Sequence, residues 1–331
     1  MTHPVGSTSN AYPPVSVIMP ILNEEAHLAE AVGSVLAQDY PGGMEVVVAV
    51  GPSRDRTREV ADELAVRDPR VVVVDNPTGR TPDGLNAALA ATSHEVVVRM
   101  DGHGALSRGY VRRAVEVLEE TGAANVGGLM LAEGRAPTQQ AVATAMRSPL
   151  GIGGARFHVG GEAGPAETVY LGVFRREWLR RVGGYDPAFA RAQDWEMNHR
   201  IRKAGGMVWF TPELTVTYRP RASLGELARQ FYRTGRWRRQ VMKQHPETVS
   251  VRYLAPPAAV VAVAAGAVGG LVWRPLWVLP LGYAASVTLG GAWIARDQPA
   301  GVIARMPVVL ATMHMTWGAG FLRGPERQPA R

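Results

Sequence analysis

Two pairs of polar residues have types and spacings that suit catalysis. The first is Asp101-Gly-His103, which follows a short apolar run. Residues i and i+2 of an extended chain point to the same side, so both side chains would reach one ligand. A carboxylate oxygen and an imidazole nitrogen suit Mn²⁺ or Mg²⁺ when substrate phosphates fill the remaining positions. In the alternative interpretation, Asp101 caps a helix that begins near Ser107 and His103 binds nothing.

The second pair, Asp194 and Glu196, opens a helix that we predict from Asp194 to Gly205. The glycine at its end and the basic residues in its last turn are typical of a helix C-terminus. Two residues apart on a helix, the carboxylates diverge and would have separate roles. Asp194 is either only the N-cap of this helix, or it lies at a helix start that faces the same crevice as the first pair.

Alternating strands and helices in residues 14–250 must position these groups. The pattern predicts an α/β domain with a Rossmann-like, mostly parallel sheet and helices on both faces, and Asn23 as the N-cap of the first helix. Ligands of such sheets bind beyond the carboxyl ends of the strands. The predicted strands end in the polar segments 20–24, 51–55, 75–76 and 101–103. We therefore expect these segments to converge on one crevice.

The composition limits the classes of chemistry. The 331 residues include no cysteine, which excludes disulfides and a thiol nucleophile, and the formal net charge is +7. Residues 1–13 are polar and proline-rich, so we predict a disordered tail without a signal peptide, and a second tail at 323–331.

The C-terminal region, 251–322, is predominantly apolar and is predicted to be a membrane domain. Segments 254–273 and 275–294 each have about 20 residues, the length that crosses a hydrocarbon core of about 30 Å. A pair of buried soluble helices is the alternative. The third apolar segment, 302–322, is interrupted by Arg305, Pro307 and His314, and it either spans the bilayer or lies in the interface. The distribution of arginines predicts a multi-pass cell-membrane protein whose domain 14–250 is cytoplasmic.

A basic segment precedes the first predicted span. Seven arginines are opposed by Glu226 alone, at positions 219, 221, 229, 233, 236, 238 and 239. Anionic lipid would hold each of these arginines by ~1 kcal/mol. Nucleic acid also binds such patches, but a basic segment beside a membrane span favours membrane lipid as the partner and no nucleic acid.

Several motifs, in order, resemble those of the family 2 glycosyltransferases of the GT-A fold. Within that family the chain is most similar to the succinoglycan-type membrane glucosyltransferases. The resemblance covers about residues 13–255. It rests on Val15-Ser-Val-Ile-Met-Pro-Ile-Leu-Asn-Glu-Glu25, Ser53-Arg-Asp-Arg-Thr57, Asp101-Gly-His103, Val182-Gly-Gly-Tyr-Asp186, Gln193-Asp-Trp-Glu196 and Gln230-Phe-Tyr-Arg-Thr-Gly-Arg-Trp237.

The resemblance implies an inverting, metal-dependent glycosyltransferase of cell-surface polysaccharide synthesis. Asp194 corresponds to the catalytic base, and Asp101 and His103 to the ligands of Mn²⁺ or Mg²⁺. The residues implied in donor binding are Pro20, Ile21, Glu24, Asp55, Asp101, Tyr170 and Gly172. Those implied at the acceptor or diphosphate are Glu196, Gln230, Arg233, Arg236 and Trp237. The implied partners are a nucleotide-sugar donor, with UDP-glucose as the first expectation, and a lipid-linked or growing glycan acceptor.

Some features depart from the family pattern or leave alternatives. Val50-Gly51-Pro52 replaces the aspartates that hold the nucleotide base in the family, so Asp75 or Asp83 is a hypothesis for that contact. The glycine-rich segment 151–164 is interpreted as a mobile lid or as a phosphate-cradling loop. Three other functions stay open: a polyprenyl-phosphate sugar synthase, a non-catalytic membrane scaffold that binds nucleotide sugar, and a nucleotidyltransferase.

Overall fold

The computed structural model describes residues 12–189 and 191–324, so most of the two predicted tails lies outside the described residues. The chain forms two compact units, and each is described by itself. We call them the sheet unit, Met1–Leu129 with Glu162–Val216, and the helical unit, Met130–Gly161 with Thr217–Arg331.

The first half of the sheet is parallel. Strands β1 (Val15–Ile21), β2 (Met44–Val50), β3 (Val71–Asp75) and β4 (Val96–Arg99) lie in the order β3-β2-β1-β4. Their sequences are short apolar runs. Most residues of β1, β2 and β4 are buried, as expected of strands covered on both faces, whereas the edge strand β3 is partly exposed. All four carboxyl ends therefore meet at one edge, as the sequence predicted.

The second half of the sheet is antiparallel. Strand β8 (Tyr170–Arg175) pairs with β4 on one side and with β6 (Asn125–Ala132) on the other. Strand β9 (Val208–Tyr218) follows, with the short strands β5 (Ala105–Leu106) and β7 (Gly164–Pro165) beside it. The predicted α/β class is confirmed, and the sheet is mixed.

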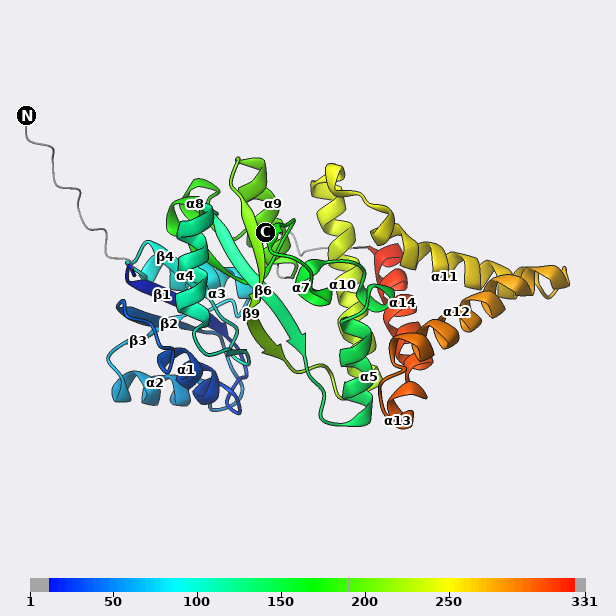
Figure 1. Cartoon of the computed structure of the whole chain (residues 1–331), viewed down its shortest axis with the longest axis horizontal. Coiled ribbons are helices and arrows are strands. Elements are labelled where there is room, and N and C mark those ends of the chain that lie inside the picture. Colours follow the sequence, from blue (N-terminus) through cyan, green and yellow to red (C-terminus); the bar gives the residue numbers. More distant parts are fainter. Residues whose placement is uncertain (1–11, 190, 325–331) are drawn as a thin grey trace, which may run out of the picture. The chain divides into compact units, whose positions relative to one another are not determined.

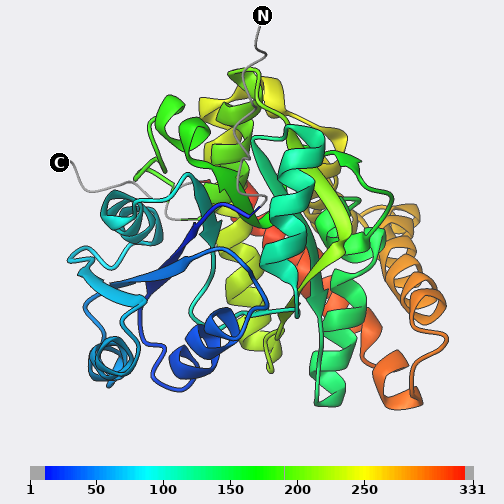
Figure 2. The same cartoon turned by 60° about the vertical axis from the view of Figure 1, so that its left-hand side comes forward.

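Helices cover both faces of the parallel half. Helices α1 (Leu28–Leu36), α2 (Thr57–Arg67) and α4 (Tyr110–Thr121) contribute to one hydrophobic core with alternate residues of β1. Helix α3 (Thr81–Ala91) packs on β1 and β2 from the opposite face, where Leu85 is fully buried (Figure 2). Helices α8 (Arg176–Arg181) and α9 (Gln193–Lys203) complete the sheet unit.

The helical unit is built around α14 (Met306–Arg323). This helix packs along α10 (Leu224–Gln244) and also contacts α11 (Val251–Gly269) and α12 (Val278–Ile294) (Figure 1). The crossing with α10 is close, since a side chain on Gly320 would overlap the backbone carbonyl of Tyr232. The other elements of this unit are α5 (Pro137–Met146), α6 (Pro149–Ile152), α7 (Arg156–Val159), η1 (Pro246–Thr248), η2 (Arg274–Trp277) and α13 (Ala300–Ile303).

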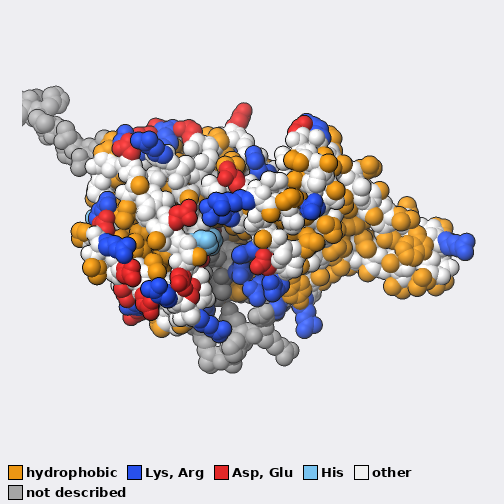
Figure 3. Space-filling model, turned by 90° about the horizontal axis from the view of Figure 1, so that it is seen from below, with side chains coloured by type: hydrophobic (Ala, Val, Ile, Leu, Met, Phe, Trp, Pro, Cys, Tyr) orange, Lys and Arg blue, Asp and Glu red, His pale blue; other side chains and the backbone are white. Residues whose placement is uncertain are grey.

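Among the described residues, two helical segments have the length and apolar composition of membrane spans. They are Val251–Gly269 and Arg274–Ile294, close to the two predicted spans, and most of each lies at the surface of the structure. Hydrophobic side chains gather over this hairpin (Figure 3), and they include Val261, Leu281 and Trp293. Helix α14, the third apolar segment, is not such a candidate, and Val309 and Met313 on it are fully buried.

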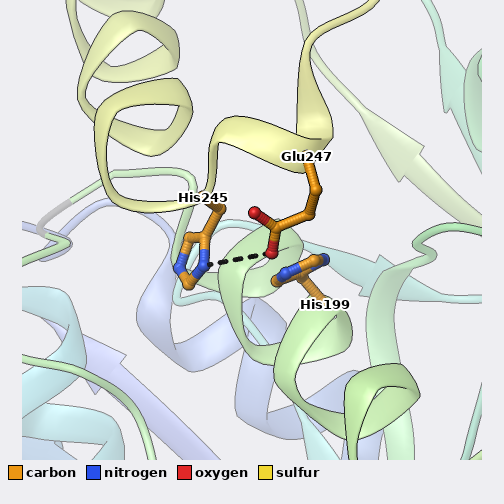
Figure 4. Close-up of side chains that lie close together, drawn as sticks. All are labelled: His199, His245 and Glu247. Atoms are coloured by element: carbon orange, nitrogen blue, oxygen red, sulfur yellow. Dashed lines mark ion pairs between the residues drawn. The ribbon is translucent and has the colours of Figure 1, made fainter.

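Polar contacts fix the turn between α10 and α11. The Nδ1 of His245 lies 3.9 Å from Glu247 Oε1 (Figure 4). The Nη2 of Arg238 donates to the carbonyl of Thr248 at 2.6 Å, and its guanidinium lies 3.6 Å from the ring centroid of Tyr253. Arg238, a buried arginine of the basic segment, thus stabilises the turn that leads into α11.

Candidate active site

The Asp101 motif forms a turn directly after β4. The N–H of Gly104 donates to the carbonyl of Asp101 at 3.1 Å, so the extended geometry assumed for residues 101–103 is wrong. The capping alternative is wrong as well, because α4 begins at Tyr110 and has Gly109 as its N-cap. Asp101 Oδ1 instead accepts a hydrogen bond of 3.0 Å from Arg99 Nη2.

His103 lies against the end of β1. Its Nδ1 is 2.7 Å from Oε1 of Glu24, which follows that strand. Gly102 permits this approach, because a Cβ there would lie 2.8 Å from Ile21 Cγ2 and 3.0 Å from Glu24 Cγ. A carboxylate that pairs with one ring nitrogen orients the other nitrogen of a metal-binding histidine. Carboxylate oxygens and imidazole nitrogens are donor types that Mn²⁺ and Mg²⁺ accept, and the role of Asp101 and His103 as cation ligands stays a prediction.

Asp194 lies in the first turn of α9. The N-cap of this helix is Ala192, with a left-handed φ of 59°, so the N-cap interpretation of Asp194 is wrong. The Asp194 carboxylate forms a salt bridge with Nη1 of Arg99. Arg99 thus contacts both aspartates that we predicted at the site, Asp101 and Asp194, although the sequence motifs did not identify Arg99 as a site residue. The signal for it was an arginine at the end of an otherwise apolar strand.

Glu196 holds α9 in place. Its two carboxylate oxygens accept hydrogen bonds of 2.6 and 2.7 Å from Nε and Nη2 of Arg200, and the side chain is buried. Arg200 Nη1 also donates to the carbonyl of Val182, at 2.5 Å. This geometry gives Glu196 a structural role, and its predicted contact with the acceptor stays a prediction.

A buried amide pair also ties α9 to the sheet. Asn125 Nδ2 on β6 donates to Asn198 Oδ1 at 2.6 Å, and Asn198 Nδ2 donates to Thr168 Oγ1 at 2.9 Å. Gly172 leaves room for this pair, because a side chain there would overlap the Asn125 amide. The structure therefore gives Gly172 a packing reason, whereas its predicted contact with donor sugar stays a prediction. Its neighbour Tyr170 packs against the core.

The Gly172→Ala variant should therefore lose stability. We expect its free energy of unfolding to fall by about 1–3 kcal/mol, because the added methyl must displace a buried hydrogen-bonded amide. Gly33→Ala, in α1 and with open space around the Cβ position, is the matched control and should be neutral or slightly stabilising. Thermal or urea unfolding measures both, and equal stabilities of the two variants would contradict the packing argument.

Tyr185, on the predicted Val182–Asp186 motif, lies within electrostatic reach of Arg99 and Asp101. Gly183 and Gly184 have φ values of 79° and 75°, which glycine adopts without strain. The amide of Asn86 then clamps the backbone of Tyr185 through bonds of 2.7 and 2.8 Å. Burial raises the pKa of the Tyr185 phenol to about 12, so the group stays neutral.

The loops after β1 and β2 are joined where the resemblance implies a nucleotide. Asn23 is not the N-cap of α1; it adopts a φ of 57°, its Oδ1 accepts from Arg54 N–H at 2.8 Å, and its own N–H donates to Ser53 Oγ. Asp55 accepts bonds from the Thr57 side chain and from the backbone N–H of Glu25. The hydrogen bond from Thr57 is the main cause that lowers the pKa of Asp55. The bonds to Asp55 order this loop.

The replaced segment Val50-Gly51-Pro52 also lies at this edge. The N–H of Gly51 donates to the carbonyl of Ile21 at 2.9 Å, which keeps the ends of β1 and β2 together. Asp75 pairs with Arg58 at 2.5 Å, and Asp83 with Arg80 at 2.7 Å. Both proposed substitutes for the base-binding aspartates therefore already have partners, and their contact with a base stays a hypothesis.

The remaining predicted residues lie on α10 of the helical unit. Gln230 Nε2 donates to the Tyr218 hydroxyl at 3.2 Å, and Arg236 Nε donates to the carbonyl of Gly324 at 2.8 Å. Arg233 is exposed and Trp237 is half-buried. Their roles at the acceptor or diphosphate stay predictions, as does the lid or phosphate role of segment 151–164.

The fold is that of GT-A enzymes, as comparison with solved structures shows. A mannosyltransferase from Pyrobaculum calidifontis, solved with GDP-Man and Mn²⁺, superposes with a TM-score of 0.60 at 21% identity, covering 94% of this chain and 87% of that one. TarS of S. aureus, residues 1–349, gives a TM-score of 0.51 at 15% identity, covering 93% and 90%. At these identities the likeness concerns the fold alone.

Sequence comparison shows the family. Residues 16–183 match the profile described as glycosyl transferase family 2. The chain is 35% identical over 313 residues to the succinoglycan biosynthesis protein ExoA of Rhizobium meliloti (strain 1021), and the match covers 93% of each. A dolichyl N-acetyl-α-D-glucosaminyl phosphate diacetamido-dideoxy-glucuronosyltransferase of Methanococcus voltae is 22% identical over 225 residues, covering 65% of this chain and 70% of that one. The chain belongs to the family 2 glycosyltransferases, and the predicted enzyme class is confirmed.

Proposed function

We propose that this glycosyltransferase is an inverting, metal-dependent enzyme of polysaccharide synthesis. It transfers a sugar, with glucose from UDP-glucose as the first expectation, to a lipid-linked or growing glycan. The observation that carries the proposal is the junction of Asp101 and Asp194 on one buried arginine at the carboxyl edge of the sheet. The similarity to a succinoglycan biosynthesis protein supports the polysaccharide pathway.

The reaction is a single displacement with Asp194 as the base. The acceptor hydroxyl oxygen attacks the anomeric carbon of the donor while Asp194 takes the hydroxyl proton. A new glycosidic bond forms, the bond from the anomeric carbon to the diphosphate oxygen breaks, and the nucleoside diphosphate leaves with the bonding electrons. A carboxylate is the form of an aspartate side chain that accepts a proton. Attack from the face opposite the diphosphate inverts the anomeric configuration.

Asp101 and His103 would hold the divalent cation. A bound Mn²⁺ or Mg²⁺ offsets negative charge on the departing diphosphate. Glu24 pairs with Nδ1 of His103, and a carboxylate partner of this kind would orient the imidazole as a cation ligand. The oxygen of Asp101 that does not face Arg99 is the atom we assign to the cation.

The donor nucleotide is proposed to lie over the ends of β1 to β3. Pro20, Ile21 and the ordered loop of Asp55 line this edge of the sheet unit. Tyr170 is assigned to the donor sugar by resemblance. Gln230, Arg233, Arg236 and Trp237 are assigned to the acceptor and diphosphate by resemblance.

We also propose that the hairpin of α11 and α12 anchors the enzyme in the cell membrane with its sheet unit in the cytoplasm. Val261, 53% exposed near the middle of α11, is a position where arginine would disturb insertion by about 2.5–3.5 kcal/mol. We expect the native chain to resist carbonate extraction from membranes and Val261→Arg to lower the membrane-bound fraction. Val66→Arg, at a position 88% exposed on α2, is the control and should leave that fraction unchanged. Release of the native chain by carbonate would contradict the anchor.

The experiment that tests the proposed function measures nucleotide release by purified, detergent-solubilised protein. UDP-, GDP- and dTDP-sugars are supplied with Mn²⁺ or Mg²⁺ and a membrane lipid extract. We expect one nucleoside diphosphate to be released in an acceptor-dependent reaction. Turnover on bare polyprenyl phosphate would favour a polyprenyl-phosphate sugar synthase, and pyrophosphate release a nucleotidyltransferase. Binding of a donor without turnover would favour a scaffold.

A further inference from the structure

Arg99 is a buried cation that the proposed chemistry does not yet use. It is the last residue of β4, between the fully buried Val98 and Met100, and only 3% of its side chain is exposed. A charged group in such a position is costly unless it is paired. The two carboxylate partners of Arg99 therefore offset the cost of burying its charge.

The two partners come from segments far apart in the sequence. Nη2 of Arg99 donates to Oδ1 of Asp101, in the turn after β4, and Nη1 contacts Oδ1 of Asp194, at the start of α9. The planar guanidinium presents its donors in a fixed fork, so it fixes two carboxylates at once, whereas an ammonium acts as a single point charge. Arg99 thus joins the carboxylates of Asp101 and Asp194.

Arg99 also reduces the negative charge of the site. One guanidinium between two carboxylates leaves this group with a net charge of −1. Without Arg99, the carboxylates of Asp101 and Asp194 would be left without the positive charge between them, and two like charges disfavour such an arrangement. The positive charge of Arg99 also opposes a cation that binds the other oxygen of the Asp101 carboxylate.

We propose that Arg99 is a positioning residue that holds the base Asp194 near Asp101 and lowers the affinity of Asp101 for a cation. The proposal rests on the proposed function, in which Asp101 binds the cation and Asp194 is the base. It predicts opposite effects of an Arg99 substitution on two measurable quantities. The affinity for a cation should rise, because the positive charge beside Asp101 is removed. The kcat should fall, because Asp194 loses the guanidinium that holds it.

The test measures binding of Mn²⁺ alone to the purified full chain, from the electron paramagnetic resonance signal of free Mn²⁺, and kcat for nucleotide release. In Arg99→Gln we expect Mn²⁺ to bind about fivefold more tightly and kcat to fall by about 10²-fold. Asp101→Asn in the Arg99→Gln background should abolish the gain in Mn²⁺ affinity. A residue with only a structural role would weaken both properties, so weaker Mn²⁺ binding or an unchanged kcat overturns the proposal.

The lysine variant covers the case in which Arg99→Gln does not fold. Lysine keeps the charge but supports one carboxylate, so in Arg99→Lys we expect kcat to fall by about tenfold. A kcat equal to that of the native chain overturns the proposal. Mn²⁺ binding needs no turnover, so it tests Arg99 even if the donor panel fails and the proposed function is wrong.

Discussion

The Asp194→Asn variant should release nucleoside diphosphate about 10²–10⁴-fold more slowly than the native enzyme, because it removes the group that takes the acceptor proton. Asparagine keeps the shape of the side chain and an oxygen that accepts a hydrogen bond from Arg99. The loss should therefore appear in kcat, with a change of less than about threefold in the KM for donor. Steady-state assays with the donor identified by the panel measure both constants.

Asp68→Asn is the matched control for this prediction. Asp68 also pairs with an arginine, Arg70, at 2.7 Å, but it precedes β3 and so lies at the amino edge of the parallel strands. Its bonds from Arg70 lower its pKa to about 2. Asp68→Asn should keep the kcat of the native chain. Full activity of Asp194→Asn would show that another group is the base.

The Asp101→Asn variant should lose metal-dependent turnover by at least about 10²-fold, since a neutral amide is a poor ligand for a hard divalent cation. Mn²⁺ titrations of activity, with and without chelator, measure the effect. His103→Gln should cost less and should change the preference between Mn²⁺ and Mg²⁺, because an imidazole is a softer ligand than an amide oxygen.

Two results would contradict this assignment of the cation site. One is native activity that survives complete chelation. The other is an Asp101→Asn variant that is activated by Mn²⁺ with the same midpoint concentration as the native chain. In either case the carboxylate of Asp101 would pair with Arg99 and would not be a ligand of the cation.

The sequence predicted the edge of the sheet where the site lies, for a simple physical reason. Valine-rich runs of four to seven residues report strands buried on both faces, and the polar residues after Ile21, Val50 and Arg99 then fall at the same edge. This argument needs only local patterns, so it succeeded for all four parallel strands.

Local sequence patterns could not predict contacts between distant segments. Arg99 and Asp194 are 95 positions apart, from the difference of their residue numbers, and their salt bridge depends on how α9 packs on the sheet. The bond between Asn125 and Asn198, which explains Gly172, is of the same kind. Asn23 was misplaced because asparagine suits both an N-cap and a left-handed turn, and only the loop from β2 decides between them.

The anomeric configuration of the product tests the single displacement by Asp194 most directly. Nuclear magnetic resonance of the glycan made from an α-linked nucleotide sugar gives this configuration, with the donor's own configuration as the internal reference. The proposed reaction predicts a β-linked product. An α-linked product would mean two displacements or front-face transfer, and it would contradict the role of Asp194 as the base of a single inverting step.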